Sequence, residues 1–415
     1  MTGRAAAPRG SPAFRRYLAG QLPSVTGSWA QVVALSWVIV SLDRRALGWV
    51  IALQFLPSLA LGPWFGAITD RHDRRRLLIA AESGLGLVAL TYALASAAGV
   101  LTMPLIYPLA TVWGIINALD TPARRALVPI LVGPGQAASA SALTGTVLVL
   151  GMTAGSALGG ALVATVGATA AFAANAASFA ADVAVLHTIR PSASPRVKRA
   201  PRQVRDGLSY VLRTPVLRAP LLALAVITTL AFTIQVSVPT LIRVSFAGGP
   251  SLIGAAFTAV TAGSLAGTLI NAARGMPGPR IFGLTAATMA GSMILTATAP
   301  AVPAALAGLT GIGLSWSIFL GSVTAVLQSA DPRMLGRVMS LFSAILLGGT
   351  AAGGPIAAAL AASIGPRAPF LAGTGAAAAI AITSTSRRPR GAIQPPDGID
   401  EASTSPNVTE PCDNS

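Results

Sequence analysis

The feature that most constrains this chain is a series of twelve long apolar segments separated by short polar ones. The segments cover residues 18–42, 47–69, 77–99, 103–121, 136–165, 167–189, 219–246, 250–273, 281–299, 303–329, 338–364 and 366–386. Each is close to or above the roughly 20 residues that a helix needs to cross a bilayer. Because lipid offers no hydrogen-bond partner to an open backbone, such segments cross as helices. The sequence therefore predicts an all-α membrane protein with twelve transmembrane helices.

The composition excludes the common classes of soluble protein. Only 10% of the residues are charged, whereas a soluble chain carries about a quarter. The formal charge of +16 does not indicate a nucleic-acid partner, because the basic residues lie between apolar segments and form no single face. A P-loop needs Gly directly before its lysine, but the only lysine, Lys198, follows Val197. His72 and His187 match no metal-ligand spacing, so we expect no enzyme, no cofactor and no metal.

The basic residues also predict the orientation of the chain. If the N-terminus lies in the cytoplasm, almost all of the 29 basic residues lie on the cytoplasmic side. Those that would lie outside are Arg44, Arg45, Arg243 and Arg367. Short cytoplasmic loops of membrane proteins carry an excess of arginine and lysine. Both termini are therefore predicted to be cytoplasmic. The abundance of Arg, Ala and Gly is typical of a GC-rich bacterial genome, which places the protein in a bacterial inner (plasma) membrane.

A polar stretch divides the twelve segments into two sets of six. We expect a cytoplasmic N-terminus at 1–17, a six-helix bundle at 18–189, a cytoplasmic linker at 190–218, a second six-helix bundle at 219–386 and a disordered cytoplasmic tail at 387–415. The linker is expected to end in a short amphipathic helix at 202–214. The spacing of Gly66, Asp70 and Arg74 after the second segment has a weaker counterpart in Gly267, Asn271 and Arg274 after the eighth. Two six-helix repeats are typical of a transporter with its substrate site between the halves.

The sequence "GAITDRHDRRRLL" at 66–78 resembles the loop signature of the major facilitator superfamily, Gly-x3-Asp-Arg-x-Gly-Arg-Arg. Asp73 replaces its second glycine. The resemblance implies a conformational latch, in which Gly66 allows close helix approach, Asp70 faces a helix N-terminus of the other half, and the arginines pair with Asp73, Glu82 or Asp120. The alternative is a solvated, positively charged loop. The latch residues would be Gly66, Asp70, Arg71, Arg74, Arg75, Asp120 and Arg124.

The fifth segment resembles the antiporter signature of the same superfamily. "GMTAGSALGG" at 151–160 keeps its glycines, and Ser156 stands where the signature has proline. The eleventh segment contains a weaker copy of this motif in which the proline is retained. Small residues at these spacings line one helix face and allow tight packing, although a generic packing face would look the same. The residues concerned are Gly151, Gly155, Gly159, Gly160, Gly354 and Pro355.

Three further short sequences indicate a particular branch of this superfamily. "FRRYLAGQLPSVTGSWAQ", "LDTPARRALVPILV" and "LGRVMSLF" are similar to the branch of bacterial drug:proton antiporters that includes macrolide efflux pumps and the enterobactin exporter. This resemblance implies a monomeric secondary active transporter that exports a small amphipathic organic molecule, such as an antibiotic or siderophore, by proton antiport with alternating access. The segment 103–121 departs from it, because it lacks the buried arginine of many such antiporters. A facilitator-type importer or uniporter, and a non-transporting membrane sensor or scaffold, remain alternatives.

Acids inside the apolar segments are the proton-coupling candidates, because a buried ionisable group in a membrane is costly. Glu82 lies near the arginines of 74–76 and is expected to pair with them or to carry a proton. Asp182 has no arginine beside it in sequence, and it shares a helix face with Asn175 and Ser178. That polar stripe either faces the substrate cavity or pairs with another helix.

The substrate cavity is expected to have apolar walls with a few polar groups, which suits amphipathic organic ligands. Structural packing is an equally good interpretation for each tryptophan. The candidates are Gln31, Trp37, Trp113, Asn117, Asn175, Ser178, Gln235 and Trp316.

Overall fold

Helices make up all the regular secondary structure of the residues that the structure describes. The structure is a computed structural model, and it describes residues 11–132, 135–189, 203–274, 279–331 and 334–386. The predicted tail at 387–415, most of the predicted N-terminal segment and the first part of the linker, 190–202, lie outside the described residues. The absence of strands from the described residues agrees with the all-α prediction.

The first six helices pack on one another and form what we call the N-terminal bundle. They are α1 (Pro12–Asp43), α2 (Ala46–Arg71), α3 (Arg74–Ala97), α4 (Met103–Val132), α5 (Ala137–Thr165) and α6 (Ala168–Thr188). α1 packs on α5 and α6, α2 packs on α4, and α3 packs on α4 and α6. Buried apolar side chains such as Ile39, Leu78 and Phe172 fill the spaces between them.

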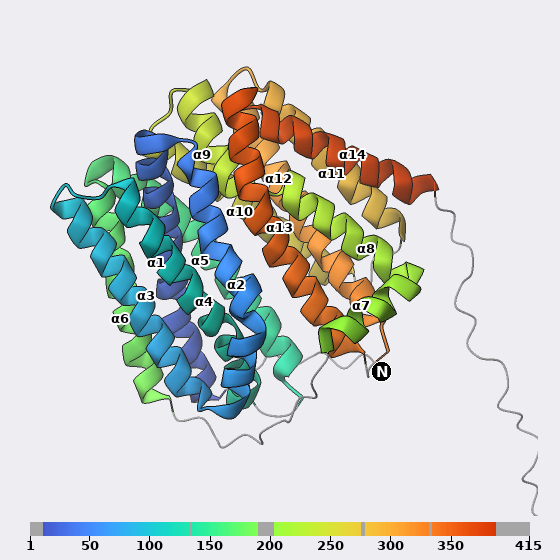
Figure 1. Ribbon diagram of the computed structural model, residues 1–415, viewed down its shortest axis with the longest axis horizontal. Helices are drawn as coiled ribbons and strands as arrows, with labels where there is room; N and C mark the ends of the chain where they lie inside the picture. The colour runs from blue at the N-terminus through green and yellow to red at the C-terminus, as the bar shows by residue number, and fades with distance from the viewer. Residues whose placement is uncertain (1–10, 133–134, 190–202, 275–278, 332–333, 387–415) are drawn as a thin grey trace, which may run out of the picture.

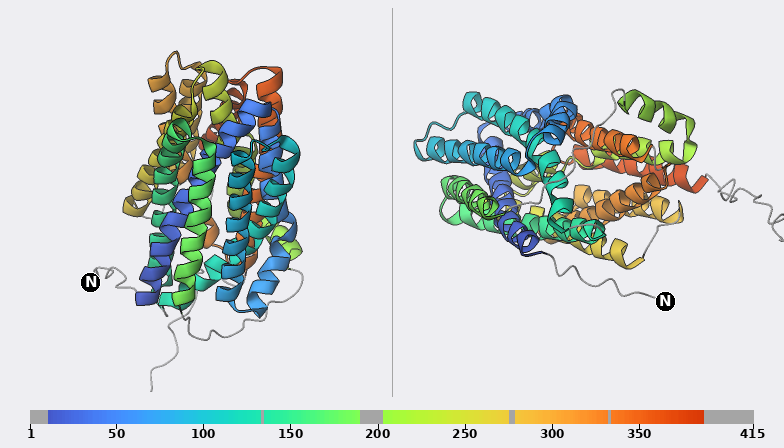
Figure 2. Two further views of the ribbon diagram at one scale, coloured as in Figure 1. Left: turned by 90° about the vertical axis from the view of Figure 1, so that its left-hand side faces the viewer. Right: turned by 90° about the horizontal axis from the view of Figure 1, so that it is seen from below.

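The remaining helices form the C-terminal bundle, which lies beside the first (Figures 1 and 2). They are α7 (Gln203–Arg213), α8 (Pro215–Val226), the π-helix η1 (Ile227–Ala231), α9 (Ile234–Ser245), α10 (Pro250–Arg274), α11 (Pro279–Thr298), α12 (Val302–Gln328), α13 (Leu335–Ser363) and α14 (Ala368–Ser386). The short helix expected at 202–214 corresponds to α7. α8, η1 and α9 together occupy the predicted seventh segment, which is interrupted at Phe232 and Thr233.

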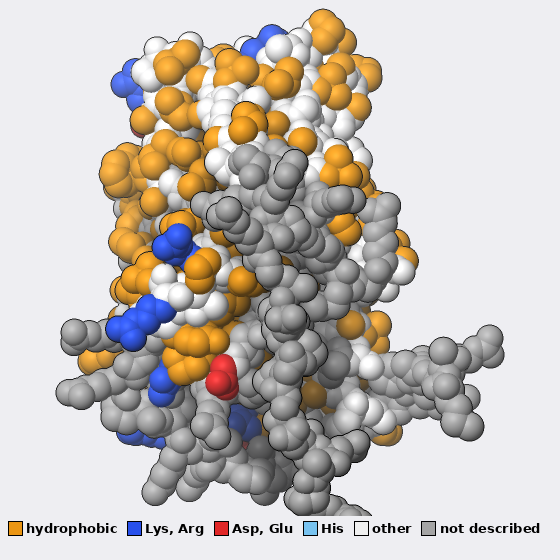
Figure 3. All heavy atoms as spheres, turned by 90° about the vertical axis from the view of Figure 1, so that its right-hand side faces the viewer, with side chains coloured by type: hydrophobic (Ala, Val, Ile, Leu, Met, Phe, Trp, Pro, Cys, Tyr) orange, Lys and Arg blue, Asp and Glu red, His pale blue; other side chains and the backbone are white. Residues whose placement is uncertain are grey.

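Nine helical segments of the described chain are long and apolar enough to cross a membrane. They are α1, α3, α5, α6, the α8–α9 segment, α10, α11, α12 and α13. α2 and α14 contain shorter apolar stretches, and α4 carries three charged residues in its second half. In Figure 3 the upper half of one face contains a band without charged side chains, with basic side chains above it and from about mid-height downward. The protein is therefore a multi-pass membrane protein, and the count of twelve crossings stays a prediction.

The two bundles touch at one end and separate toward the other. Near the α1–α2 connection, Gly48 of α2 meets Gly354 of α13, and farther along α2 the side chain of Leu59 still reaches Gly348. Beyond that point, a Cβ added to Gly62 or Gly66 would meet no heavy atom within 4 Å. We call the end with the α1–α2 and α13–α14 connections the closed end. The end with the α2–α3 and α12–α13 connections is the open end (Figure 1).

Candidate functional site

A buried cluster of charged side chains lies inside the N-terminal bundle, and Arg124 is at its centre. The Nη2 atom of Arg124 donates a hydrogen bond to Glu82 of α3. It also lies 3.3 Å from Asp120 Oδ1 on α4 and 3.4 Å from Asp182 Oδ2 on α6. The Nε atom donates to Asp120 Oδ2 at 3.3 Å. We call these four residues the Arg124 cluster.

Side chains of α1 also contact the cluster. The guanidinium carbon of Arg124 lies 5.9 Å from the centre of the Tyr17 ring, and Ser24 Oγ donates to Glu82 Oε2 at 3.4 Å. Asp182 and Glu82 are almost fully buried, with side-chain exposures of 0% and 2%. Gly20 leaves the room that Asp182 occupies, because a Cβ there would collide with Asp182 Oδ1. Four helices therefore converge on one guanidinium.

The acidic groups in this cluster outnumber the basic ones. Three carboxyl groups share one guanidinium, so full ionisation would bury two uncompensated negative charges. An uncompensated charge in a dry interior is strongly unfavourable, and protonation of a carboxyl group removes it. Arg124 Nη1 and Asp182 Oδ1 are buried without a hydrogen-bond partner among the described residues, so the network can exchange partners when a proton arrives. Chemically, the cluster is suited to binding and releasing a proton.

Two expectations about these charges were wrong, and one alternative is decided. Glu82 pairs with Arg124 rather than with the arginines at 74–76. Asp182 pairs with another helix, the second of its two interpretations, because α6 brings it against Arg124 of α4. The fourth helix does contain a buried arginine, because α4 does not end near residue 121 but continues through Pro122 to Val132. Membrane helices tolerate proline better than soluble ones, and the continuation places Asp120 and Arg124 four residues apart on one face.

The polar stripe of α6 faces α1, not a cavity between the bundles. Asn175 Nδ2 donates to Gln31 Oε1 of α1 at 2.9 Å. Ser178 Oγ donates to the carbonyl of Asn175 at 2.8 Å, and it lies against Gly27 of α1. Three of the predicted cavity residues, Gln31, Asn175 and Ser178, thus tie α1 to α6 within one bundle.

The predicted latch residues split into two groups. Asp120 and Arg124 belong to the buried cluster, whereas Gly66, Arg71, Arg74 and Arg75 lie at the open end around the α2–α3 connection. Arg75 was expected to pair with an acid, but it makes no ion pair with the side chains that the structure describes. It donates to the carbonyls of Leu186 and His187 at 2.7 and 2.8 Å, which satisfies the end of α6. Asp73 caps α3 by accepting from the Arg76 amide at 3.0 Å.

Gly66 makes no close helix contact in this conformation, since an added Cβ would meet no heavy atom within 4 Å. The side chain of Asp70 lies outside the part of the chain that the structure describes. With the bundles apart at this end, no described atom of the C-terminal bundle comes within 4 Å of a Cβ placed on Gly66.

The glycine face of α5 packs on α1 and, at the closed end, on α10. A Cβ on Gly151 would lie 2.8 Å from Val25, and one on Gly159 would lie 2.6 Å from the Ala30 Cα. Gly155 sits against the Thr26 carbonyl and Trp29. A Cβ on Gly160 would lie 2.8 Å from the Gly254 Cα of α10. In the eleventh segment, Gly354 makes the matching contact with Gly48 of α2, and Pro355 lies inside α13.

The other predicted cavity residues are spread over both bundles. Trp37 of α1 lies 4.7 Å below the guanidinium of Arg243 of α9, which joins the bundles at the closed end. Trp113 and Asn117 of α4 and Gln235 of α9 are partly buried. Trp316 of α12 is buried and stacks on Phe232, with ring centres 4.0 Å apart.

The helix interruption at Phe232 was not predicted, because its sequence contains no glycine or proline. Thr228 and Thr229 of η1, and Thr233 beside it, lie against Gly349 and Gly353 of α13. A π-turn often marks a functional position in a helix. The run of threonines was the available signal, since hydroxyls bond to nearby carbonyls and compete with regular helix structure.

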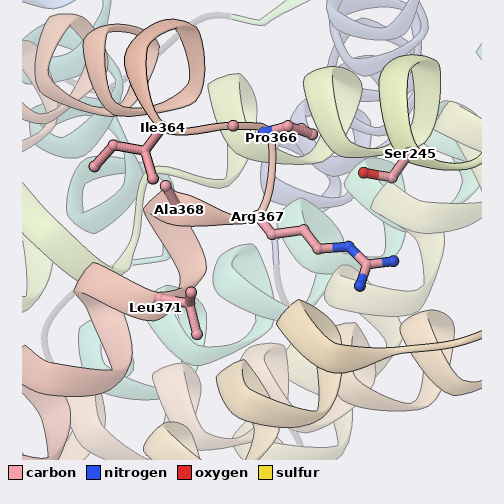
Figure 4. A pocket seen from close by; sticks show the side chains of 7 residues that line it. Ser245, Ile364, Pro366, Arg367, Ala368 and Leu371 are labelled. Carbon is pink, nitrogen blue, oxygen red and sulfur yellow. The ribbon is translucent and has the colours of Figure 1, made fainter.

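Two shallow cavities lie at the closed end, away from the Arg124 cluster. The larger, of about 320 Å³, is lined by Ser245, Ile364–Ala368 and Leu371, and Figure 4 shows Arg367 extending toward Ser245. The other, of about 200 Å³, includes Arg44 and Thr240. Neither lining contains a predicted cavity residue, so neither supports the predicted substrate site.

Comparison with known proteins finds similar membrane transport proteins. A family model described as a transmembrane secretion effector matches residues 4–407. The chain is 33% identical over 108 residues to the staphyloferrin A transporter of Staphylococcus aureus (strain NCTC 8325 / PS 47), an alignment that spans 25% of this chain and only 27% of that relative. It is 25% identical to macrolide efflux protein A of Streptococcus pyogenes, over 80% of this chain and 85% of that protein.

Solved structures show the same fold at low sequence identity. The nucleoside transporter NupG aligns with a TM-score of 0.69 and 11% identity, over 90% of this chain and 98% of that one. This likeness concerns the arrangement of helices alone.

Proposed function

The chain belongs to the transmembrane secretion effector family of the major facilitator superfamily, and from this premise we propose that it is a secondary active exporter. Transporters of this superfamily carry small molecules, and several relatives are efflux proteins. The proposed cargo is a small amphipathic organic molecule that leaves the cytoplasm in exchange for protons. The protein would act as a monomer in a bacterial inner membrane, with both termini in the cytoplasm.

The observation that carries this proposal is the Arg124 cluster. Its three carboxyl groups and one guanidinium are buried in a membrane protein, where ionisable groups are costly and mark ion pathways. Asp182 and Glu82 are the proposed proton carriers, because they are the most deeply buried of the three acids. The negative charge of each acid has a second role. It pairs with Arg124 and thereby keeps α3, α4 and α6 packed together.

The arrangement of the two bundles supports the proposed alternating access, because they touch at one end only. If the termini are cytoplasmic, the open end faces the cytoplasm and the conformation accepts cargo from inside. Closing that end would bring α13 toward the Gly66 region of α2. We propose that Gly66, Asp70 and the arginines at 71, 74 and 75 act as the latch in that second conformation.

The proposed substrate class rests on the relatives and on two aromatic side chains at the interrupted helix of the C-terminal bundle. Macrolide efflux protein A and the staphyloferrin A transporter are named for a macrolide and for staphyloferrin A. Here Phe232 and Trp316 supply aromatic surface next to the hydroxyls of the interrupted helix. Aromatic walls with a few hydroxyl groups suit such a molecule.

Proteoliposomes with an acidic lumen test the proposal. A radiolabelled macrolide and staphyloferrin A serve as the first probes, and lumenal accumulation is measured with and without a protonophore. An antiporter accumulates its substrate on the acidic side, and the protonophore abolishes that accumulation. Asp182→Asn should lose accumulation but keep exchange of labelled for unlabelled substrate, since the amide mimics the protonated carboxyl group.

The same assay separates the alternatives. An importer that moves substrate together with protons would deplete it from the acidic lumen. A facilitator would equilibrate the probe regardless of the gradient. A sensor or scaffold would move neither probe under any gradient, and an Asp182→Asn variant that still accumulates substrate would exclude Asp182 as the essential carrier.

A further inference from the structure

A second surface, far from the Arg124 cluster, has a composition that nothing in the transport cycle explains. It lies where α7 joins α8, at the open end of the C-terminal bundle. α7 is strongly amphipathic, and it packs on α8 and α13. Figure 3 views the molecule from this side and shows basic side chains next to apolar ones in the lower half of the face.

The inner face of this corner is anchored to the protein core. Val211, Leu217 and Leu221 are almost fully buried in the apolar core of the C-terminal bundle. The Tyr210 hydroxyl accepts a hydrogen bond from the Asp331 amide at 3.3 Å, next to the start of α13. α7 is therefore a fixed part of the bundle and not a loose section of the linker.

Exposed apolar side chains lie on both helices of this corner, and we call them the apolar stripe. Leu208 and Leu212 lie one turn apart on α7, and Val216 follows four residues later on α8. These three side chains are 44%, 55% and 58% exposed. Higher on α8, Leu222 and Val226 continue the exposed apolar surface. A soluble surface with a stripe of this kind would be unusual.

Two arginines fix the depth of this stripe in the bilayer. Arg213 and Arg218 are exposed beside it. Arg218, Leu222 and Val226 follow one another at intervals of four residues, each about 6 Å farther along α8. α8 thus begins at the level of a cation and runs into a lipid-facing apolar surface, which is the order of headgroup and hydrocarbon in a membrane.

We propose that the α7–α8 corner binds anionic phospholipid, with the phosphates at Arg213 and Arg218 and the acyl chains against Leu208, Leu212 and Val216. Charge complementarity selects this occupant. A basic residue at an anionic membrane surface strengthens binding by about 1 kcal/mol, or about fivefold. An apolar stripe beside it inserts at the boundary between headgroups and acyl chains. The bound lipid would hold α7, and through Tyr210 the start of α13, at the membrane surface.

Thermal unfolding of the full-length protein in detergent tests this site. Phosphatidylglycerol should raise the unfolding temperature of the wild type, whereas phosphatidylcholine should raise it much less. The double variant R213Q/R218Q should need about 25-fold more phosphatidylglycerol for the same shift, because two fivefold contributions are lost. The matched control is R76Q, which removes an exposed arginine of α3 and should respond like the wild type.

Three outcomes would overturn the proposal. They are an unchanged lipid response in R213Q/R218Q, an equal response to phosphatidylcholine, and an equal response to inorganic phosphate, which would indicate a free anion site. A second measurement does not depend on stability. Leu212→Cys in a Cys412→Ser background, labelled with an environment-sensitive dye in phosphatidylglycerol vesicles, should be quenched by lipids brominated near the headgroup. A dye that stays in a water-like environment and is not quenched would show that α7 lies in solution.

Discussion

Arg124 is the residue that makes three buried acids compatible with a membrane interior. Its guanidinium has several donors in a planar arrangement, so it contacts Glu82, Asp120 and Asp182 at once. Lysine would supply the charge as a single point. The cluster therefore depends on the shape of arginine as well as on its charge.

Replacing Arg124 should destabilise the N-terminal bundle more than replacing an exposed arginine does. Arg124→Gln leaves three carboxyl groups without a counter-ion and should cost about 3 kcal/mol, the range for breaking a buried ion pair. Arg124→Lys should cost less. Thermal unfolding in detergent measures the effect, and Arg125→Gln is the control, because the adjacent Arg125 is exposed on the same helix.

A second variant separates charge from packing. If uncompensated charge is the cause, Glu82→Gln combined with Arg124→Gln should recover part of the lost stability. An Arg124→Gln protein that unfolds at the wild-type temperature would contradict the central role given to this residue.

The acids of this cluster were recognisable from the sequence, but their partner was not. Glu82 and Asp182 stand out because they interrupt apolar segments. Arg124 does not, because Pro122 reads as a turn and a pair of arginines after an apolar run reads as a cytoplasmic loop. Only the packing of α3, α4 and α6 shows that the helix continues and that its arginine points inward.

At the scale of the helices, the apolar pattern located most elements well. The predicted segment at 167–189 matches α6, and that at 136–165 matches α5. The failures are α4, which runs past Pro122, and the α8–α9 segment, which is interrupted where no glycine or proline occurs. In both cases tertiary contacts decide the backbone, and a local pattern does not contain them.

The α5–α1 contact gives a prediction at this scale. Gly155→Leu places a large side chain against the Thr26 carbonyl and Trp29, and overpacking of this kind costs about 1–3 kcal/mol. The unfolding temperature should fall and transport should weaken. Gly375→Leu is the control, since a Cβ on Gly375 of α14 meets nothing within 4 Å. Unchanged unfolding of Gly155→Leu would mean that α1 and α5 can separate without loss.

At the scale of the whole molecule, two glycine contacts hold the closed end together. Gly160 of α5 meets Gly254 of α10, and Gly354 of α13 meets Gly48 of α2. Gly160 and Gly354 belong to corresponding motifs in the two halves of the chain, so the two contacts are related. Backbones approach this closely only where side chains are absent, so the pair favours the conformation that is open at the other end.

Gly160→Leu should therefore shift the balance between the two conformations. The new side chain cannot fit against the backbone of Gly254, so the closed end should separate and the open end should close around the latch. Spin labels in a Cys412→Ser background measure this as distances. Labels at Arg44 and Ile364, both exposed at the closed end, should move apart, whereas labels at His72 and Arg213 at the open end should approach. Gly291→Leu, on an unobstructed position of α11, should change neither distance. If Gly160→Leu lengthens the first distance without shortening the second, the bundles do not pivot as rigid units and the proposed alternation is wrong.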